Sequence, residues 1–390
     1  MRAVYIVSAV RTPVGRNNGY LRKWTAPELL GAALKEAARR IDLDPALVDD
    51  VITGTVYQVG EQGFTLARMA VLAAGFPVTV PGVSVNRQCG SSLTAIQMAH
   101  GMIASGTMDI VIAGGCELMS KYGMFSDLNG TLYNGNPMGN PFGPFYTDRF
   151  GNPDQIEAAQ MIADQWGITK EECQDFAVAS HRKAHEATTK GYFKNEILPM
   201  RGLDKEGREI TRDTDETIRP ETSRESLEAL KVLPKTKWIT AGLSSTITDG
   251  SSAVVLMGED RMRELKVEPL ARIVANAVAG SDPRLMLTGP IYATPKVLSR
   301  AGLKLADMDI YEINEAFAPI PLAWAKELQA DLDRLNVNGG AMALGHPVGN
   351  SGCRLMVTAV HELRRRGGRY ALVSLCTGGG MAPATVIERA

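Results

Sequence analysis

The sequence predicts an α/β protein with a largely buried sheet. Short apolar segments alternate with longer segments of helical periodicity through the first ninety residues, and this order is typical of such folds. A similar order recurs near the end of the chain. The first series comprises expected strands over residues 4–9, 50–53 and 83–86 and expected helices over residues 26–39 and 66–74.

The local sequence gives a physical reason for these elements. The expected strands are short apolar runs, as Val-Tyr-Ile-Val-Ser-Ala over residues 4–9 illustrates. The helix over 26–39 follows Thr25, whose hydroxyl can cap the helix start, and Pro27 and Glu28 suit its first turn. Periodicity and capping therefore agree on the alternation.

The two series of elements indicate an internal repeat. In the first, the strand over 83–86 is followed by a Gly/Ser-rich turn, a helix and a strand that runs into two glycines. In the second, a strand over 335–338 is followed by a Gly-rich turn, a helix over 351–365 and a strand over 370–375 that runs into three glycines. We therefore expect two similar α/β halves packed together.

A segment of different character separates the halves. Residues 130–144 are rich in Gly, Asn and Pro, and helices are expected over residues 155–166 and 170–189. We expect this insertion to lie over the functional site, because long excursions from a compact core are often functional lids. The expected division is residues 1–120 with about 240–265 as the N-terminal half, 121–239 as the insertion, and 266–390 as the C-terminal half.

Charge and composition exclude several classes of function. The 390 residues contain 42 Lys and Arg against 43 Asp and Glu, so the formal charge of -1 indicates no nucleic-acid partner and no anionic membrane surface. No window of about 18 uncharged apolar residues suggests a transmembrane helix. The first ten residues lack the long apolar core of a secretory signal, and we expect a cytoplasmic protein.

The cysteine content predicts free thiols and no metal. Five cysteines are an odd number spread over a long chain, which argues against a disulfide framework. None forms a Cys-x-x-Cys pair, and no His lies two to four residues from a Cys, so the spacing is not that of a metal site. We expect neither a metal nor a tightly bound cofactor.

Cys89 is the first candidate for chemistry. It follows an expected strand and begins an expected helix, in Asn-Arg-Gln-Cys-Gly-Ser-Ser-Leu over residues 86–93. Backbone N–H groups and the dipole at a helix start stabilise a thiolate, so we expect a lowered pKa for this thiol. A small buried residue in a strand-to-helix turn explains the same pattern equally well.

Three further candidates lie in the second half. His346 occupies the glycine-rich loop Gly-His-Pro-Val-Gly-Asn-Ser-Gly over residues 345–352 and can accept a proton from a thiol at neutral pH. Cys376 ends a hydrophobic strand before three glycines, whose N–H groups suit an oxyanion hole. Asn314 stands at the end of the strand over 309–313. Structural roles also explain these residues: a hydrogen bond that holds the loop for His346, a core position for Cys376 and a helix cap for Asn314. The other four histidines lie on expected helices and receive no chemical role.

Together these four segments resemble the thiolase family, and the resemblance covers essentially the whole chain. It implies the thiolase fold, in which two similar α/β halves form a layered αβαβα core that carries a long insertion. Further segments match the family in order and spacing: residues 11–15 (Arg-Thr-Pro-Val-Gly), 113–120 (Ala-Gly-Gly-Cys-Glu-Leu-Met-Ser), 215–220 (Asp-Glu-Thr-Ile-Arg-Pro), 248–251 (Thr-Asp-Gly-Ser), 289–296 (Gly-Pro-Ile-Tyr-Ala-Thr-Pro-Lys) and 314–318 (Asn-Glu-Ala-Phe-Ala).

The resemblance implies an acyl exchange in two steps. Cys89 would take an acyl group as a thioester after His346 removes its proton, and Cys376 would move the α-proton of the second substrate. Asn314, through a water, and His346 would form one oxyanion hole, and the backbone N–H groups of Cys89 and Gly378 would form the other. Cleavage of 3-ketoacyl-CoA by CoA and condensation of acyl-CoA with acetyl-CoA both use this arrangement.

The resemblance also implies how coenzyme A binds as a substrate. Arg219 would lie near the nucleotide end and Ser245 near the pantetheine, with Met286 and Phe317 also in contact with substrate. A surface salt bridge explains Arg219 equally well, and a turn explains Ser245. The family further implies a homodimer or a homotetramer.

Some positions depart from the family pattern. Ser92 and Leu287 stand where Gly is usual, Leu243 stands where Asn is common, and Met381 begins a segment that is commonly Gln-Gly. We expect Ser92 to crowd or re-aim the helix that carries Cys89. The acyl chain length and the physiological direction of the reaction stay open.

Two other functions fit part of the pattern. A carrier-protein-dependent condensing enzyme of the ketosynthase type also has a nucleophilic cysteine, but it normally uses two histidines, whereas the second position here is Cys376. A non-catalytic acyl-CoA-binding protein with a thiolase fold is suggested by Ser92 and Met381. Retention of the four reaction residues argues against it.

Overall fold

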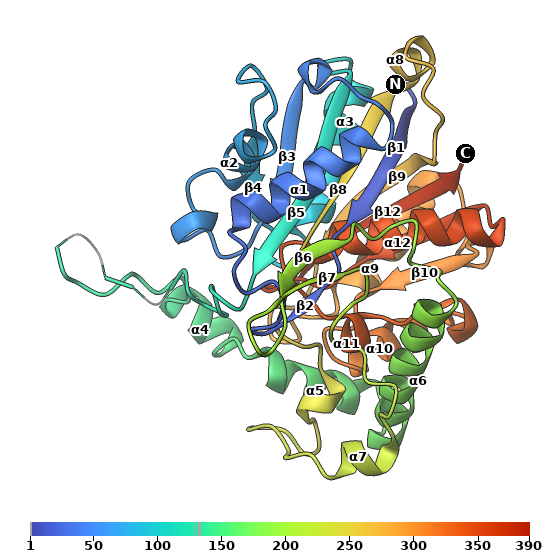
Figure 1. Cartoon of the computed structure of the whole chain (residues 1–390). Helices are drawn as coiled ribbons and strands as arrows, with labels where there is room; N and C mark the ends of the chain where they lie inside the picture. The colour runs from blue at the N-terminus through green and yellow to red at the C-terminus, as the bar shows by residue number, and fades with distance from the viewer. Residues whose placement is uncertain (1, 129, 132–133) are drawn as a thin grey trace.

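The computed structural model describes residues 2–128, 130–131 and 134–390 (Figure 1). Met1, in the expected N-terminal half, and Asn129, Leu132 and Tyr133, in the expected insertion, lie outside the described residues. Strands and helices alternate along the chain, as the sequence predicts.

The strands form two sheets. The small one pairs β6 (Met200–Leu203) with β7 (Glu209–Arg212). The large one is mixed and contains β1 (Val4–Arg11), β2 (Gly15–Arg16), β3 (Asp50–Gly54), β4 (Val83–Val85), β5 (Ile110–Leu118), β8 (Thr248–Gly258), β9 (Ala271–Gly280), β10 (Ile310–Ile313), β11 (Tyr370–Ser374) and β12 (Met381–Arg389).

The helices flank the large sheet and build the insertion. They are α1 (Ala26–Arg39), α2 (Leu66–Ala73), α3 (Ser91–Ala104), α4 (Pro144–Phe150), α5 (Gln155–Trp166), α6 (Lys170–Thr189), α7 (Arg224–Glu228), α8 (Glu259–Glu264), α9 (Gly289–Ala301), α10 (Pro319–Leu328), α11 (Ala341–Leu344) and α12 (Ser351–Arg366).

The large sheet consists of two halves joined by a narrow contact. Its order is β10-β11-β12-β9-β1-β8-β5-β3-β4, with β2 beside β8. Strand β1 pairs with β8 along most of its length but with β9 only through Tyr5 and Ile6. The sheet therefore divides between β1 and β9, and β8 joins the first half although it follows the insertion. These pairings support the proposed division of the chain into two halves and an insertion.

Helices complete a layered structure around the two sheet halves. Helices α1 and α2 pack against the first half and α9 against the second, while α3 and α12 contact each other between them. The α3–α12 crossing is close, since a Cβ atom on Gly352 would lie 2.6 Å from the backbone nitrogen of Leu93. The expected α/β fold with an αβαβα core is confirmed.

Local signals set several helix boundaries as predicted. Helices α1, α5 and α6 have the predicted bounds. Thr25 caps α1, because its Oγ1 accepts a hydrogen bond from the Glu28 N–H while the Glu28 carboxylate accepts one from the Thr25 N–H. Thr169 and Glu172 form the same capping box at the start of α6. Short-range hydrogen bonding is thus sufficient to define these helix starts.

The strand expected over residues 335–338 is wrong. This segment forms only an isolated bridge between Leu335 and Tyr311, because Asn336 has a left-handed backbone (φ +44°) that breaks an extended strand. The Asn336 side chain takes the place of a pairing strand. Its Oδ1 accepts from the Ile313 N–H at 2.9 Å, and its Nδ2 donates to the Ile313 carbonyl at 2.8 Å.

The insertion packs on the second half. Helix α5 contacts α10, and α6 contacts α11. The described residues on either side of 129 and 132–133, ahead of α4, extend away from the body of the molecule as an arm (Figure 1, left). None of the described helices has the length and apolarity to cross a membrane.

Candidate functional site

A strained turn presents Cys89 at the start of α3. Gln88 has a left-handed backbone (φ +48°), which costs about 1 kcal/mol or more for a residue other than glycine. Ser91 holds the turn closed, since its Oγ accepts from the Arg87 N–H at 2.9 Å and donates to the Gln88 carbonyl at 2.5 Å. The Cys89 side chain is half-buried. The strained backbone therefore serves to aim the thiol.

Two backbone N–H groups and a second thiol surround Cys89. The N–H groups of Cys89 and Gly378 lower the pKa of the Cys89 thiol, but burial outweighs them and raises it to about 11. The expected lowered pKa of Cys89 is therefore wrong, because burial destabilises the thiolate more than the nearby N–H groups stabilise it. Cys376 is completely buried, and burial together with the neighbouring Cys89 raises its pKa well above the usual range. Both thiols are neutral at neutral pH.

His346 is held in one tautomer by Ser351. Nδ1 of His346 lies 2.6 Å from Ser351 Oγ, which itself donates to the Pro347 carbonyl at 2.9 Å. Because that bond uses the only hydroxyl proton, Ser351 Oγ accepts from Nδ1–H, and Nε2 is the unprotonated ring nitrogen. Burial, and then Arg354, lower the pKa of His346 to about 3. The imidazole is thus a neutral proton acceptor at Nε2.

Asn314 completes the polar group around His346. It follows β10, and its N–H donates to the Ser374 carbonyl of the parallel strand β11 at 3.2 Å. Asn314 and Cys376 therefore lie just beyond the ends of two neighbouring strands. Its Nδ2 lies 3.3 Å from His346 Nε2. Among the described residues, its buried Oδ1 has no hydrogen-bond partner. The amide is therefore placed to bind a further group.

Glu117 ties the loops of the two halves together. One carboxylate oxygen accepts from the N–H groups of Val56 (2.8 Å) and Gly349 (3.0 Å). The other accepts from the Tyr57 N–H (3.2 Å) and from Gln62 Nε2 (2.7 Å). Burial raises the pKa of Glu117 to about 7, against the opposing effect of these donors. This carboxylate fixes the loop that carries His346.

Ser92 is accommodated without a clash. Its Oγ accepts from the Cys353 N–H of α12 at 2.9 Å, so the two central helices are joined next to the site. Gly115 makes room for it, because a Cβ there would lie 2.7 Å from the Ser92 Cβ. The expected crowding is thus relieved by a neighbouring glycine. Leu243 and Leu287 are buried in one apolar cluster, and the Met381 carbonyl accepts from Thr377.

The expected CoA-binding residues divide into two groups. The Ser245 N–H donates to the Ala316 carbonyl at 2.9 Å, and Phe317 bridges to Ser244, so both adjoin the strand end that carries Asn314. Arg219 is exposed, and its N–H donates to His181 Nδ1 at 3.2 Å. Met286 is buried with φ +50°. In the described residues, no hydrogen bond joins Arg219 or Met286 to the catalytic candidates.

Sequence reasoning missed the supporting roles of Glu117 and Ser351. A signal for Glu117 exists, because it is a carboxylate near the end of an otherwise apolar run over residues 110–118. Ser351 has no comparable signal, since a serine at a helix start is ordinary. In the parts of the chain that the structure describes, no three His, Cys, Asp or Glu side chains are grouped to hold a metal.

Comparison with known proteins gives a consistent result. Residues 4–260 match the thiolase N-terminal domain and residues 267–389 the thiolase C-terminal domain. The chain is 41% identical to the steroid 3-ketoacyl-CoA thiolase FadA6 of Mycobacterium tuberculosis (100% of this chain, 95% of the relative). It is 43% identical to a 3-ketoacyl-CoA thiolase of Marinobacter nauticus (100% and 98%). Among solved structures, the Bacillus anthracis acetyl-CoA acetyltransferase has a TM-score of 0.91 at 38% identity, covering 100% of this chain and 99% of that one.

Proposed function

Because the chain belongs to the thiolase family and is a CoA-dependent acyltransferase, we propose that it transfers acyl groups through a thioester on Cys89. The single observation that carries this proposal is the position of the thiol at a strained helix start, facing the N–H groups of Cys89 and Gly378. The same arrangement would cleave 3-ketoacyl-CoA with CoA or condense acyl-CoA with acetyl-CoA.

The first step is a proton transfer that prepares the nucleophile. Nε2 of His346 takes the Cys89 proton, and the thiolate sulfur attacks the carbonyl carbon of the substrate. The bond from that carbon to the CoA sulfur breaks in condensation, and the carbon–carbon bond to the acetyl-CoA enolate breaks in cleavage. The Cys89 thiol and the His346 imidazole are both neutral before substrate binds. The proton therefore moves to His346 only as the attack transfers negative charge to the substrate oxygen. His346 then carries protons on both nitrogens, with Ser351 accepting from Nδ1.

Two sets of donors stabilise the charge that develops on substrate oxygens. The N–H groups of Cys89 and Gly378 face one oxygen at the acylated sulfur. Asn314 Nδ2 and protonated His346 Nε2, 3.3 Å apart, can donate to the other oxygen, with Asn314 acting through a water. Their burial makes each hydrogen bond stronger than it would be in water.

Cys376 serves as the second acid and base. In condensation, the Cys376 thiol first gives its proton to the departing CoA sulfur, and the thiolate that remains removes the α-proton of acetyl-CoA. The resulting carbanion attacks the thioester carbon, and the released Cys89 sulfur takes back the proton held by His346. In cleavage, the Cys376 thiol protonates the departing enolate. The Cys376 thiolate then takes the thiol proton of CoA, whose sulfur accepts the acyl group and releases the Cys89 sulfur to be protonated by His346. Its position beside Cys89 supports this role, because the proton would then move next to the acyl group. Ser245 and Phe317 would contact the pantetheine arm, and Met286 the bound substrate, while the exposed Arg219 would meet the nucleotide.

The proposal is tested by turnover of a series of 3-ketoacyl-CoAs with CoA. We expect cleavage in the wild type, none in Cys89→Ser, and full activity in the matched control Cys173→Ser, which removes a buried thiol from α6. Cleavage that persists in Cys89→Ser would overturn the proposed nucleophile. Acyl transfer only to an acyl carrier protein would indicate a ketosynthase-type enzyme, and CoA binding without turnover a non-catalytic protein.

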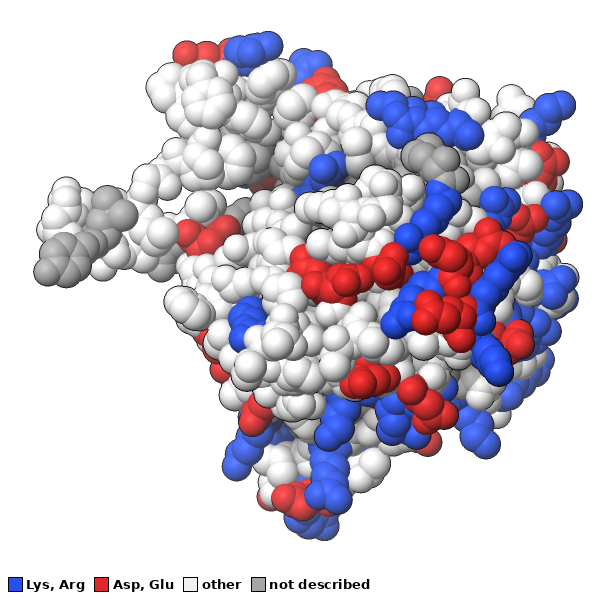
Figure 2. Space-filling model, turned by 90° about the horizontal axis from the view of Figure 1, so that it is seen from above, with Lys and Arg blue, Asp and Glu red and all other residues white. Residues whose placement is uncertain are grey.

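A homodimer is the assembly that the surface favours. Strand β4 is the end of the large sheet, and no strand among the described residues pairs with its outer edge. The side with the protruding arm carries few charges in Figure 2, whereas charges of both signs cover the opposite side. Large apolar side chains are exposed around this edge: Phe64 (78%), Val78 (76%), Leu72, Val83, Met98 and Met102.

The assembly and compartment are both open to measurement. Sedimentation of the wild type should give twice the chain mass of 42.0 kDa, or four times if two dimers associate, and Val78→Lys should shift the mass toward the monomer. A monomeric wild type would overturn the homo-oligomer.

The five free cysteines fit a reducing cytoplasm, and a tagged protein should localise there.

A further inference from the structure

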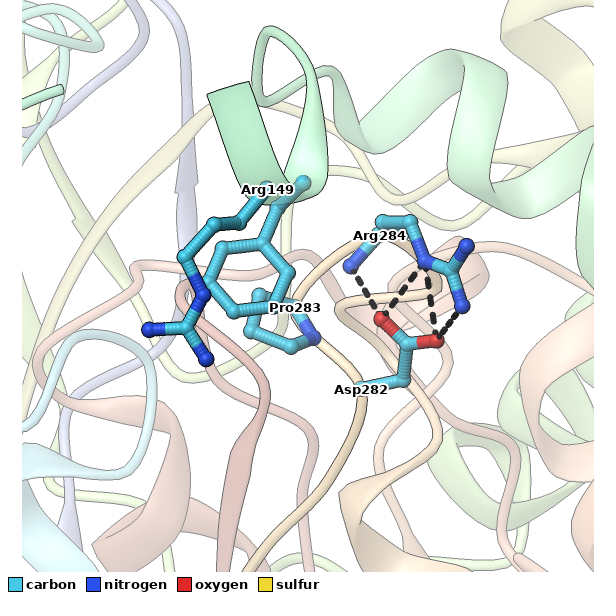
Figure 3. Close-up of a pocket in the computed structure, with 5 residues that line it drawn as sticks. Arg149, Asp282, Pro283 and Arg284 are labelled. Atoms are coloured by element: carbon cyan, nitrogen blue, oxygen red, sulfur yellow. Dashed lines mark hydrogen bonds and ion pairs between the residues drawn. The ribbon is translucent and has the colours of Figure 1, made fainter. Parts of the chain in front are cut away.

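A cavity of about 510 Å³ lies between the end of α4 and the loop between β9 and α9. Figure 3 shows Arg149 on one side of it, Pro283 in the middle, and Arg284 with Asp282 on the other side. The remaining lining residue is Phe150. The cavity therefore combines apolar rings with three charged groups.

The charges of this cavity do not cancel. Arg284 is neutralised by Asp282, because its Nη2 donates to a carboxylate oxygen at 2.6 Å and its Nε lies 3.1 Å from both oxygens. The Arg149 guanidinium lies over the Phe150 ring, 4.9 Å from the centroid. It has no ion-pair partner in the residues that the structure describes. One positive charge is thus left for a ligand.

The cavity borders the catalytic turn. The Ser281 N–H donates to the Gly380 carbonyl at 2.8 Å, and Gly380 packs against Pro283, which lines the cavity. Gly378, whose N–H faces the Cys89 sulfur, lies two residues earlier, so its Cα is at most about 8 Å from that of Gly380. The short segment 378–380 therefore lies beside both Cys89 and this cavity.

Buried hydroxyl groups nearby are also left without partners. Tyr146 Oη and Ser281 Oγ are buried and make no hydrogen bond with any described residue. Tyr146 lies beside the cavity, because the centroid of its ring is 5.3 Å from that of Phe150, which lines the cavity. Buried hydroxyls normally have partners, so these two indicate a polar ligand beside the cation.

We propose that this cavity binds the distal carboxylate of the acyl chain, so that the preferred substrates are 3-ketoacyl-CoAs that end in a carboxylate. The inference rests on the proposed function, because it places the acyl chain on Cys89. The carboxylate pairs with Arg149, and the Tyr146 and Ser281 hydroxyls can donate to it. The methylene groups of the chain pack on Phe150 and Pro283. An acyl chain ending in methyl leaves all three donors unused.

The test compares pairs of 3-ketoacyl-CoAs of equal chain length, one ending in a carboxylate and one in a methyl group. We expect the wild type to have the higher kcat/KM on the carboxylate of each pair at the fitting chain length. Arg149→Gln should lower kcat/KM for the carboxylate about tenfold and leave the methyl-ended substrate unchanged. Arg149→Lys should restore part of the loss, and the control Arg263→Gln, which changes an exposed arginine on α8, should have no effect.

Three results would contradict the inference, and they differ in what they mean for the proposed function. Turnover of the methyl-ended substrates without preference for the carboxylate would overturn this inference and leave the proposed function intact. An equal loss on both substrates in Arg149→Gln would overturn it too, and would show that Arg149 binds the CoA phosphates that both share. No turnover of any substrate would overturn the proposed function itself and the inference with it.

Discussion

The N–H of Gly349, three residues after His346, donates to a carboxylate oxygen of Glu117 at 3.0 Å. The same oxygen accepts from the Val56 N–H beyond the end of β3, so one buried carboxylate joins a loop of the first half to the His346 loop of the second. The residues proposed to carry the reaction come from both halves, and their relative position depends on links of this kind.

Glu117→Gln should impair both folding and catalysis. The Glu117 carboxylate accepts four hydrogen bonds, two at each oxygen. In glutamine an NH2 group replaces one oxygen, and this group would face two N–H groups that also donate. We expect the free energy of unfolding to fall by about 1–3 kcal/mol and kcat to fall as the His346 loop shifts. Urea denaturation and steady-state turnover measure the two effects. Glu209→Gln, at an exposed position of β7, is the control, and wild-type values for Glu117→Gln would refute the positioning role.

Ser351→Ala should reduce turnover more than stability. Without the hydroxyl, Nδ1 of His346 loses its acceptor, and the tautomer with a proton on Nε2 becomes populated, which cannot accept the Cys89 proton. We expect kcat to fall at least about tenfold, with a loss of about 1 kcal/mol in stability. An unchanged kcat in a folded variant would show that Ser351 does not select the tautomer. Ser299→Ala on the exposed side of α9 controls for the substitution itself.

Alkylation of Cys89 should accelerate with pH in the substrate-free protein. With a pKa of about 11, the thiolate fraction rises about tenfold for each pH unit below that value, and only the thiolate reacts. The rate of iodoacetamide modification should therefore increase steadily from pH 7 to 10, and Cys89→Ser identifies the reacting site. A rate that levels off near pH 7 would mean that His346 holds an ion pair with Cys89 before substrate binds.

Ser92→Gly should destabilise the protein without abolishing activity. The change removes the hydrogen bond to the Cys353 N–H and introduces glycine into the first turn of α3. The Cys353 N–H keeps its bond to the Asn350 carbonyl, so no buried donor is orphaned. We expect a loss of about 1–2 kcal/mol in thermal or urea unfolding. Ser299→Gly measures the glycine cost alone, and a more stable Ser92→Gly variant would contradict the bridging role.

Residue patterns of short range could be predicted from the sequence. The α/β class, the two halves and the bounds of α1, α5 and α6 follow from apolar periodicity and, at the start of α1, from the Thr25 cap. The strand expected over 335–338 failed because Asn336 turns its backbone and pairs through its side chain, which apolar alternation does not reveal.

By itself, the sequence determined the fold class, the family resemblance and the set of candidates Cys89, Asn314, His346 and Cys376, because local periodicity, capping and motif spacing are properties of neighbouring residues. Only the tertiary structure decided that Cys89 and His346 rest in neutral forms, that Glu117 joins the two halves, and that Arg149, without an ion pair among the described residues, lines a cavity near the Gly378–Gly380 turn. Burial and charge pairing depend on groups far apart in the chain, and the folded packing alone brings them together.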